Sequence, residues 1–394
     1  RPGVPKVPTM ITPRASITPY LIADVRGAYA LLNPDTSLSA GDTLPGTDFT
    51  LREQTYAGYV QYDLATRLAG IGLRANLGVR YYQTKLTSRG TAVTGSTLTP
   101  VLVTNTYDDF LPALNLAFDL DPSLVFRVSA TRNINRPGLG DMRAAATLNL
   151  AAFGGTISAG NPNLAPFRAD SIESSLEYYD GDRGFFAIGA FYKKMKSFIT
   201  SETTQVPYSS TGYPLSLLTL GQSPDVLINF TRPINGPGAS IRGLEIAGKR
   251  DFDFLPAPFN HFGVLGNLTV ADGSTDVFYS GRPVELPLPN LSKFSSIATV
   301  YYETDNWGVR VSSAIRGKSR VAAGGNGNIG EYFPYTYNFD ASAFFNVTPN
   351  LKLSLEAINI TDQRLVQYAD RDAKRVMTNT VSGRTILFGA TMRF

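Results

Sequence analysis

The stretch GRTILFGATMRF (residues 383–394) has the pattern of a β-strand with two different faces. Successive side chains of a strand point to opposite sides, so a repeat of two residues separates the faces. One face carries Phe394, Met392, Ala390, Phe388 and Ile386, and the other carries Arg393, Thr391, Gly389, Leu387 and Thr385. The pattern predicts a half-buried strand. Taken alone, it fits the last strand of a soluble β-sandwich as well as a strand of a membrane protein.

The composition limits the class of protein. The chain has 394 residues, of which 43% are hydrophobic, and it is rich in Tyr, Phe and Gly. No apolar run approaches the roughly 18 residues of a membrane helix, but a barrel strand exposes only alternate residues to lipid and needs no such run. The absence of cysteine excludes disulfides, thiolate metal ligands and a cysteine nucleophile. The net charge of +4 is spread along the chain without a basic block, which argues against a nucleic-acid partner.

The same period of two recurs from residue 51 onwards. In the segment 73–87, for example, Leu73 and Ala75 alternate with Arg74 and Asn76. We predict thirteen antiparallel strands on this pattern. They are residues 51–63, 73–87, 110–119, 124–132, 170–179, 185–200, 241–254, 262–271, 293–302, 307–316, 335–347, 351–360 and 383–394.

The connections between these segments alternate strictly between short and long. Short turns such as residues 120–123 alternate with the long links 88–107, 133–169, 201–231, 272–291, 317–334 and 361–382. Nothing orders loop lengths in this way in a soluble sandwich. Short periplasmic turns, long extracellular loops and strands that are apolar outside and polar inside are typical of outer-membrane barrels. We therefore expect an all-β protein that forms an antiparallel transmembrane β-barrel.

The polar face of the predicted strands carries many charged residues. A face so rich in charge is too costly to place in lipid, but it fits a wet or plugged lumen. The residues that we single out as facing the lumen, or a plug within it, are Arg74, Arg80, Arg127, Glu177 and Arg310.

The orientation and the strand count lead to further expectations. The last strand of such a barrel ends at the periplasm, so every long link is expected to be extracellular. Single-chain bacterial barrels have an even number of strands, whereas the count here is odd. Together with the Pro-rich, loop-like start, this suggests the C-terminal piece of a longer barrel. We divide the chain into an extracellular loop region, residues 1–49, and a barrel part, residues 50–394.

Several stretches carry a family resemblance. They are FLPALNLAFDLDPSLVFRVSATRNINRPGLGDM (110–142), GNPNLAPFRADSIESSLEYY (160–179), GFFAIGAFYKKMKSFI (184–199), IRGLEIAGKRDF (241–252) and LEAINITDQ (355–363). Together with the terminal Phe394, they resemble the TonB-dependent receptors (transporters) of the bacterial outer membrane. Each motif alone is weak, but their combined spacing is fairly specific and covers nearly all of the chain from residue 51 onwards.

The resemblance implies a barrel of 22 strands around an N-terminal plug domain, and barrels of that size do have plugged lumens. This chain would hold the last thirteen strands without the plug. The resemblance also implies multi-pass location in the bacterial outer membrane and a TonB-type energy-coupling complex that acts through the plug. Further implied partners are outer-membrane lipid, the barrel assembly machinery with Phe394 as its signal and, in some family members, a surface lipoprotein. It implies no cofactor and no nucleic acid.

Aromatic and charged residues in the long links are candidates for ligand contact. Flat aromatic rings stack on sugars or on the aromatic groups of chelators, and arginine binds anionic or hydroxylated groups. The candidates are Tyr107, Phe153, Tyr208, Tyr213, Tyr279, Tyr332, Tyr368, Arg136, Asp141, Arg143 and Arg168. For any single aromatic residue, packing within a loop or in the membrane girdle is the favoured alternative. The charged residues could equally tie the longest loop to its neighbours.

Other features give no sign of catalysis or metal binding. His261 is the only histidine and sits beside a short turn without convergent partners. The acidic pairs Asp108–Asp109 and Asp370/Asp372 fall in predicted links without ligand spacing, so we interpret them as solvated charge. The glycine-rich run at 324–328 lacks the Lys-Ser/Thr ending of a phosphate loop and suggests a flexible loop tip.

The resulting functional hypothesis is active import, by a protein that is not an enzyme, of a scarce ligand such as an oligosaccharide or a ferric siderophore. Three alternatives stay open. A passive porin shares the alternating pattern but has no plug. A surface ligand-binding barrel would lack energy coupling. A soluble all-β sugar-binding protein would need another explanation for the order of loop lengths.

Overall fold

The computed structural model describes most of the chain. The described residues are 47–95, 97–151, 153–197, 199–218, 221–279, 282–322, 330–369 and 374–393. Almost all of the region 1–49 lies outside them. So do the glycine-rich run 324–328, the pair Asp370/Asp372 and Phe394.

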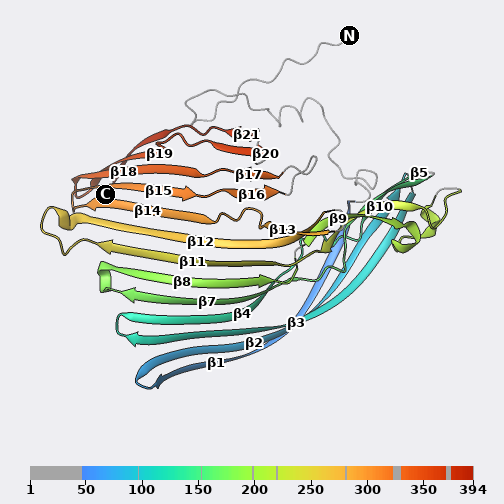
Figure 1. The fold of residues 1–394 in the computed structure, drawn as a ribbon, viewed down its shortest axis with the longest axis horizontal. Coiled ribbons are helices and arrows are strands. Elements are labelled where there is room, and N and C mark those ends of the chain that lie inside the picture. The colour runs from blue at the N-terminus through green and yellow to red at the C-terminus, as the bar shows by residue number, and fades with distance from the viewer. Residues whose placement is uncertain are drawn as a thin grey trace, which may run out of the picture.

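One antiparallel sheet forms the body of the molecule (Figure 1). Its strands follow one another in chain order, apart from shorter strands in the long links, and each pairs with the next. They are β1 (Phe49–Leu68), β2 (Ile71–Thr94), β3 (Thr97–Asp121), β4 (Leu124–Asn135), β7 (Phe167–Tyr179), β8 (Gly184–Met195), β11 (Ala239–Asp251), β12 (Phe262–Tyr279), β14 (Phe294–Glu303), β15 (Trp307–Arg316), β18 (Thr336–Thr348), β19 (Leu351–Ile358) and β22 (Thr385–Met392). Each segment in which the period of two predicts a strand coincides with one of these.

The short turns lie together at one end of the sheet, beside the C-terminus (Figure 1). Ala69 and Gly70 join β1 to β2 and both have positive φ, 50° and 86°. Such a two-residue turn matches the right-handed twist of the strands that it connects. The β3–β4 and β18–β19 connections are equally short. The alternation of short and long connections in the sequence therefore places all long links at the opposite end.

The long links contain more strand than the sequence analysis predicts. Residues 88–107 are not a link, because β2 and β3 pair without interruption as far as Thr94 and Thr97. This segment is rich in Thr and Val, which favour strands, and a reading based on polarity alone overlooks that preference. The predicted strand 185–200 also breaks after Met195, and a new strand begins at Ile199. The additional strands are β5 (Ala146–Ala151), β6 (Gly154–Ala159), β9 (Ile199–Pro207), β10 (Leu227–Asn235) and β13 (Arg282–Pro287), with β16 (Ser319–Ala322), β17 (Glu331–Phe333), β20 (Leu365–Ala369) and β21 (Arg375–Thr380) in a second sheet.

Helical structure in the described residues is restricted to four short 3-10 turns. They are η1 (Gly181–Arg183), η2 (Tyr208–Ser210), η3 (Leu215–Leu217) and η4 (Phe259–His261). None of the helices in this part of the chain is long and apolar enough to cross a membrane.

The register gives the sheet two chemically different faces. Across β1, β2, β3, β4 and β7, one face carries the polar row Asp63, Asn76, Asn115, Ser129 and Glu173. The adjacent row on the other face carries Leu64, Ala75, Leu116, Val128 and Ser174. Many apolar side chains of the second face are exposed, including Ile172 at 53% and Leu244 at 54%. We call the first face the inner face and the second the outer face.

The main sheet has two free edges in the described residues. The outer strand β1 pairs only with β2, and β22 pairs only with β19, so pairing does not close the sheet. The sheet is nevertheless strongly curved, and β1 and β22 are its first and last strands (Figure 1).

The long links build a hydrophobic core of their own, which we call the loop core. Its buried residues are Ala92, Ala146, Leu148, Ile157, Ala159, Tyr208, Leu217, Ile228 and Phe230. The core is held together by parallel pairing of β10 with β6 and of β5 with the upper part of β2. Gly90 of β2 lets the loop approach closely, because a Cβ at this position would collide with the backbone of Ala145.

Candidate functional site

The wall of the inner face is lined by ion pairs between neighbouring strands. Arg74 contacts Asp119 at 2.6 Å and Arg127 contacts Glu177 at 2.8 Å. Arg310 lies 2.5 Å from Glu303. The structure therefore places four of the five residues predicted to face the lumen in pairs with other charged residues. The fifth, Arg80, is exposed and lies on the same face of β2 as Arg74 and Asn76, because even numbers of positions separate the three residues.

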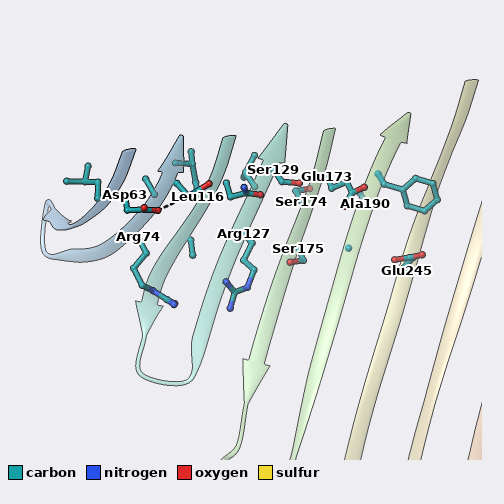
Figure 2. Close-up of a pocket in the computed structure, with 18 of the residues that line it drawn as sticks. Asp63, Arg74, Leu116, Arg127, Ser129, Glu173, Ser174, Ser175, Ala190 and Glu245 are labelled. Atoms are coloured by element: carbon teal, nitrogen blue, oxygen red, sulfur yellow. Dashed lines mark hydrogen bonds between the residues drawn. The ribbon is translucent and has the colours of Figure 1, made fainter. Parts of the chain in front are cut away.

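A concavity of about 850 Å³ lies against this wall (Figure 2). Arg74, Arg127, Ser175 and Glu245 form a row nearer the short turns, and Asp63, Ser129 and Glu173 form a second row above it. Lys193 pairs with Glu173 at 3.0 Å. Because both signs of charge are interspersed, the wall offers hydrogen-bonding groups to a polar occupant without a strong field of either sign.

Above the wall, side chains from β1, β2, β3 and β7, together with Arg136 after β4, form a polar group that we call the mouth cluster. It comprises Glu53, Thr55, Tyr82, Thr84, Tyr107, Asp109, Arg136 and Arg168. In one half of it, Asp109 accepts hydrogen bonds from the Tyr82 hydroxyl at 2.9 Å and from Arg168 Nε at 2.5 Å. Arg168 comes from β7, so the contact bridges the place where β3 and β4 diverge.

The other half of the mouth cluster is organised by Arg136, directly after β4. Its guanidinium donates to Thr55 Oγ1 at 3.2 Å and lies 3.5 Å from Glu53 Oε2. The second carboxylate oxygen of Glu53 is buried and has no hydrogen-bond partner among the described residues. Tyr107 is buried and contacts the ring of Tyr82 edge to face, with centroids 6.4 Å apart. The three predicted ligand contacts Arg136, Tyr107 and Arg168 are thus brought into one cluster.

The predicted contacts Tyr208 and Tyr213 belong to the loop core. Tyr208 is completely buried and donates its hydroxyl to the carbonyl of Pro214 at 2.8 Å, so in this arrangement its ring offers no surface to a ligand. Tyr213 packs edge to face on Phe230, with centroids 6.3 Å apart. Burial raises the pKa of Tyr213 to about 12 and also raises the pKa of Tyr208.

The remaining predicted contacts lie around the loop core. Arg143 donates to the carbonyl of Gly140 at 3.0 Å, and its Nε is buried without a partner among the described residues. Asp141 accepts at its backbone carbonyl from the amide of Asn161 at 2.6 Å. Phe153 is 99% exposed near the turn between β5 and β6. These residues are not gathered around one point in the way that the mouth cluster is.

The second sheet holds another predicted pair. The rings of Tyr332 in β17 and Tyr368 in β20 lie 5.9 Å apart, on paired positions of the two strands. Tyr279 is the last residue of β12, and its side chain lies outside the described part of the structure.

Four residues of the mouth cluster, among them Thr55, were not singled out by sequence reasoning, and one was interpreted wrongly. Glu53, Thr55, Tyr82 and Thr84 sit in extended strands without any motif. Asp109 was interpreted as solvated loop charge, but it lies within β3 and binds Arg168 and Tyr82. The alternation of Tyr107 and Asp109 on one face, continuous with the strand below, was the signal that could have revealed its inward position.

Metal ligation finds little support in the described residues. No group of three or more His, Asp or Glu side chains there converges on a point. His261 lies in η4, where its ring is 5.6 Å from the ring of Tyr302.

The family model for the β-barrel of TonB-dependent receptor-like proteins matches residues 18–360. The chain belongs to the TonB-dependent receptor family. This is the family that the sequence motifs resembled, and its β-barrel is an outer-membrane structure. No curated protein matches the chain in sequence.

Solved structures of TonB-dependent receptors share the fold. The siderophore receptor PiuA from Acinetobacter baumannii aligns with a TM-score of 0.58 at 16% identity, covering 88% of this chain and 44% of PiuA. The ferric-catecholate import receptor Fiu from E. coli K12 gives 0.58 at 16%, covering 87% and 45%. The ferric yersiniabactin uptake receptor FyuA from Yersinia pestis gives 0.56 at 13%, covering 88% and 47%. The chain thus spans less than half the length of these three structures, and at this identity the likeness concerns the fold alone.

Proposed function

We propose that the protein is an outer-membrane receptor that captures a scarce ligand at its extracellular mouth and imports it by TonB-dependent transport. The observation that carries the proposal is the pairing of an apolar outer face with a polar inner face beneath a folded loop core. In a barrel wall of this kind, lipid covers the outer face and the ligand passes along the inner face.

The mouth cluster supports a binding role for the end of the wall that lies next to the long links. Arg136 and Arg168 lie where the wall meets the loop core, beside Tyr82 and Tyr107. Guanidinium groups and phenols suit ligands with carboxylates, catecholates or many hydroxyl groups. Ferric siderophores and oligosaccharides both meet this description, so the proposal includes both classes.

The two free edges of the sheet are part of the same proposal. Unpaired backbone groups are too costly in lipid, because no water is present to satisfy them. We therefore propose that β1 and β22 pair with further strands in the complete receptor, giving the 22-stranded barrel and plug that the resemblance implies. Coupling to the TonB complex would act through that plug.

Uptake by energised cells tests the proposal. A strain lacking the gene for this protein would be compared with a complemented strain, using a catecholate siderophore loaded with radioactive iron and a fluorescent maltooligosaccharide as probes. We expect complementation to restore uptake of one probe, and a protonophore or deletion of the TonB gene to abolish it. Uptake that continues at full rate without the proton gradient would make the protein a passive porin. Binding without uptake would make it a surface-binding barrel.

Variants in the mouth cluster sharpen the test. Arg136→Ala and Arg168→Ala each remove a charged hydrogen-bond donor, and such bonds contribute about 1.5–3 kcal/mol. We expect each variant to raise the half-saturating ligand concentration by roughly tenfold or more. The matched control is Arg183→Ala in η1, an arginine with a comparable ion pair in a short periplasmic turn. An equal effect of all three would point to general destabilisation and contradict a binding role of the mouth.

A further inference from the structure

A second recess lies on the inner face, away from the mouth cluster. It has a volume of about 670 Å³ and is lined by residues of β12, β14, β15 and β18, which lie side by side (Figure 1). The register places four lining residues in one row across these strands, Thr269, Ser295, Arg316 and Thr336. Glu245 of β11 pairs with Thr269 and lines the concavity of Figure 2, so this row belongs to the inner face. Strands β8 and β11 separate the recess from the mouth cluster.

The last long link borders the recess on its other side. It leaves the wall at Asn359, whose φ of 57° is a conformation that asparagine tolerates. The Asn359 side chain donates to the carbonyl of Gly383 at 2.9 Å and accepts from the amide of Gln363 at 2.7 Å, so it ties the two ends of the link together. The side chain of Gln363 accepts from the amide of Tyr337 in β18 at 2.9 Å. These contacts hold the start of the link against the wall, where Arg364 contributes to the lining of the recess.

The lining of the recess is polar and positively charged. Besides Arg316 and Arg364, it contains hydroxyl and amide side chains, among them Asn267, Thr269, Ser295, Thr336, Asn338 and Ser382. In the described part of the chain, no Asp, Glu or aromatic residue lines the recess. The concavity of Figure 2 is different, because Asp63, Glu173 and Glu245 contribute carboxylates to its lining.

The two arginines of the recess are not neutralised by neighbouring side chains. Both are exposed, and among the described residues neither belongs to an ion pair, in contrast to the paired arginines of the wall. Arg316 donates to the backbone carbonyl of Asn290 at 2.8 Å, which carries no net charge. Asp340, further along the inner face of β18, accepts from the backbone amide of Asn359 at 2.7 Å, and Glu245 lies one strand outside the lining. An anionic ligand would therefore gain charge-assisted hydrogen bonds without displacing an existing ion pair.

This combination of groups selects a class of ligand. The planar fork of a guanidinium matches a carboxylate through two parallel hydrogen bonds. Hydroxyl and amide side chains can both donate to and accept from the hydroxyl groups of the same ligand. A neutral sugar would leave both arginines without an anionic partner. A catecholate would meet no aromatic ring among the described lining residues on which to stack.

We propose that this recess binds a hydroxycarboxylate, that is, a ligand with carboxylate and hydroxyl groups on an aliphatic or sugar frame. Its carboxylates would pair with Arg316 and Arg364, and its hydroxyl groups would contact Thr269, Asn338 and their neighbours in the lining. Two sources share this chemistry, namely the ferric chelate of a hydroxy acid and an oligomer of a sugar acid. The inference rests on the proposed function and narrows the ligand to one that is anionic and non-aromatic.

The test measures binding to the full receptor, purified in detergent, by isothermal titration calorimetry. The probes are ferric citrate, trigalacturonate, the ferric complex of 2,3-dihydroxybenzoate and maltotriose. We expect ferric citrate or trigalacturonate to bind at least about tenfold more tightly than the catecholate complex and the neutral sugar, because each charge-assisted hydrogen bond contributes roughly a tenfold factor or more. The tighter binder of the two identifies the source of the hydroxycarboxylate.

The double variant R316Q/R364Q tests the two arginines directly. It should weaken binding of the preferred hydroxycarboxylate on the order of 100-fold, because two charged donors are lost. The matched control is Lys318→Gln, which removes an exposed cation two residues after Arg316 that does not line the recess. This control should leave the affinity within about twofold, because charges between exposed groups are screened by water and salt.

The results separate this inference from the proposed function. Equal affinity of the wild type and the double variant overturns the inference, as does binding of the catecholate complex or maltotriose as tightly as both hydroxycarboxylates, or binding of none of the probes. If the double variant fails to fold, the single variant Arg364→Gln and the order of wild-type affinities decide. Energy-dependent uptake of a catecholate siderophore or a neutral maltooligosaccharide at the wild-type rate by the double variant would reject the inference and leave the proposed function standing. Arginine-dependent binding of a hydroxycarboxylate without uptake would support the recess and reject transport.

Discussion

The loop core and the barrel wall use apolar strand residues in opposite ways. Leu148 of β5 is 1% exposed, whereas Ile172 of β7 is 53% exposed, although both belong to strands of the same sheet. In the loop core, apolar side chains face one another and exclude water, as in a soluble protein. In the wall, they face outwards, and the polar side chains face inwards.

This difference shows that one chain is built for two solvents. Exposed apolar area on the scale of the wall is not tolerated by a soluble protein, but lipid covers it at no cost. In the proposed placement, the loop core stands above the lipid and must bury its own apolar surface. Truncation of a buried apolar side chain should therefore destabilise the loop core, whereas a charge on the outer face should destabilise the wall. These two kinds of substitution test the comparison.

The largest effect is expected from Tyr208→Ala. Truncating a completely buried aromatic side chain costs about 3–5 kcal/mol, because the cavity that it leaves collapses only partly. Hydrogen exchange and limited proteolysis should show that the loops around residues 199–235 open, while heat-modifiable migration of the barrel stays normal. Tyr208→Phe is the matched control. It loses only the hydrogen bond to Pro214, about 1 kcal/mol. If the barrel wall unfolded together with the loops, the two regions would not be independent.

Leu176→Arg tests the wall. Leu176 lies on the outer face of β7, and an arginine in the lipid-facing band costs about 2–4 kcal/mol near the midplane and less towards the interface. The urea concentration at which the barrel unfolds in lipid vesicles should fall accordingly, with the loop core unaffected. Ser175→Arg, one position along on the inner face, should have a much smaller effect because the inner face is polar. Equal destabilisation by both arginines would show that the outer face does not contact lipid.

The wall was largely predictable from the sequence, and the reason is its uniform environment. Every wall strand separates the same two media, so the period of two appears in each of them, as in the alternation of Leu73 and Ala75 with Arg74 and Asn76. The short turns could also be located, because Pro, Asp and Gly mark them. The additional strands in the long links could not be found in this way, since β5, β6, β9 and β10 bury residues against one another rather than in a common medium.

The candidate site was predictable only in part. Arg136, Arg168 and Tyr107 drew attention because of their chemistry, and the structure gathers them in the mouth cluster. Tyr208 has the same chemistry as Tyr107, but its ring packs in the loop core. The sequence does not distinguish them, because the distinction depends on which long links fold against each other. Glu53 and Tyr82 became visible only once the register had placed them beside Arg136 and Asp109.

The smallest predicted effect is a pH dependence restricted to the loop core. Burial raises the pKa of Tyr213 to about 12, above the value near 10 of an unfolded tyrosine. Below pH ~10 both states keep the proton, and the contribution of Tyr213 to stability is fully present. Between pH ~10 and ~12 the unfolded loops lose the proton while the folded loops keep it, so stability of the loop core falls as the pH rises. Across this pH range, the protection of the loop amides against hydrogen exchange should fall more steeply in the wild type than in Tyr213→Phe. In that variant only other groups, such as Tyr208, still titrate. Exchange in the wall strands should be the same in both proteins. Parallel loss of protection in wall and loops would mean that the two regions share one cooperative unit, and that the separation between a water-excluding core and a lipid-covered wall does not extend to their stability.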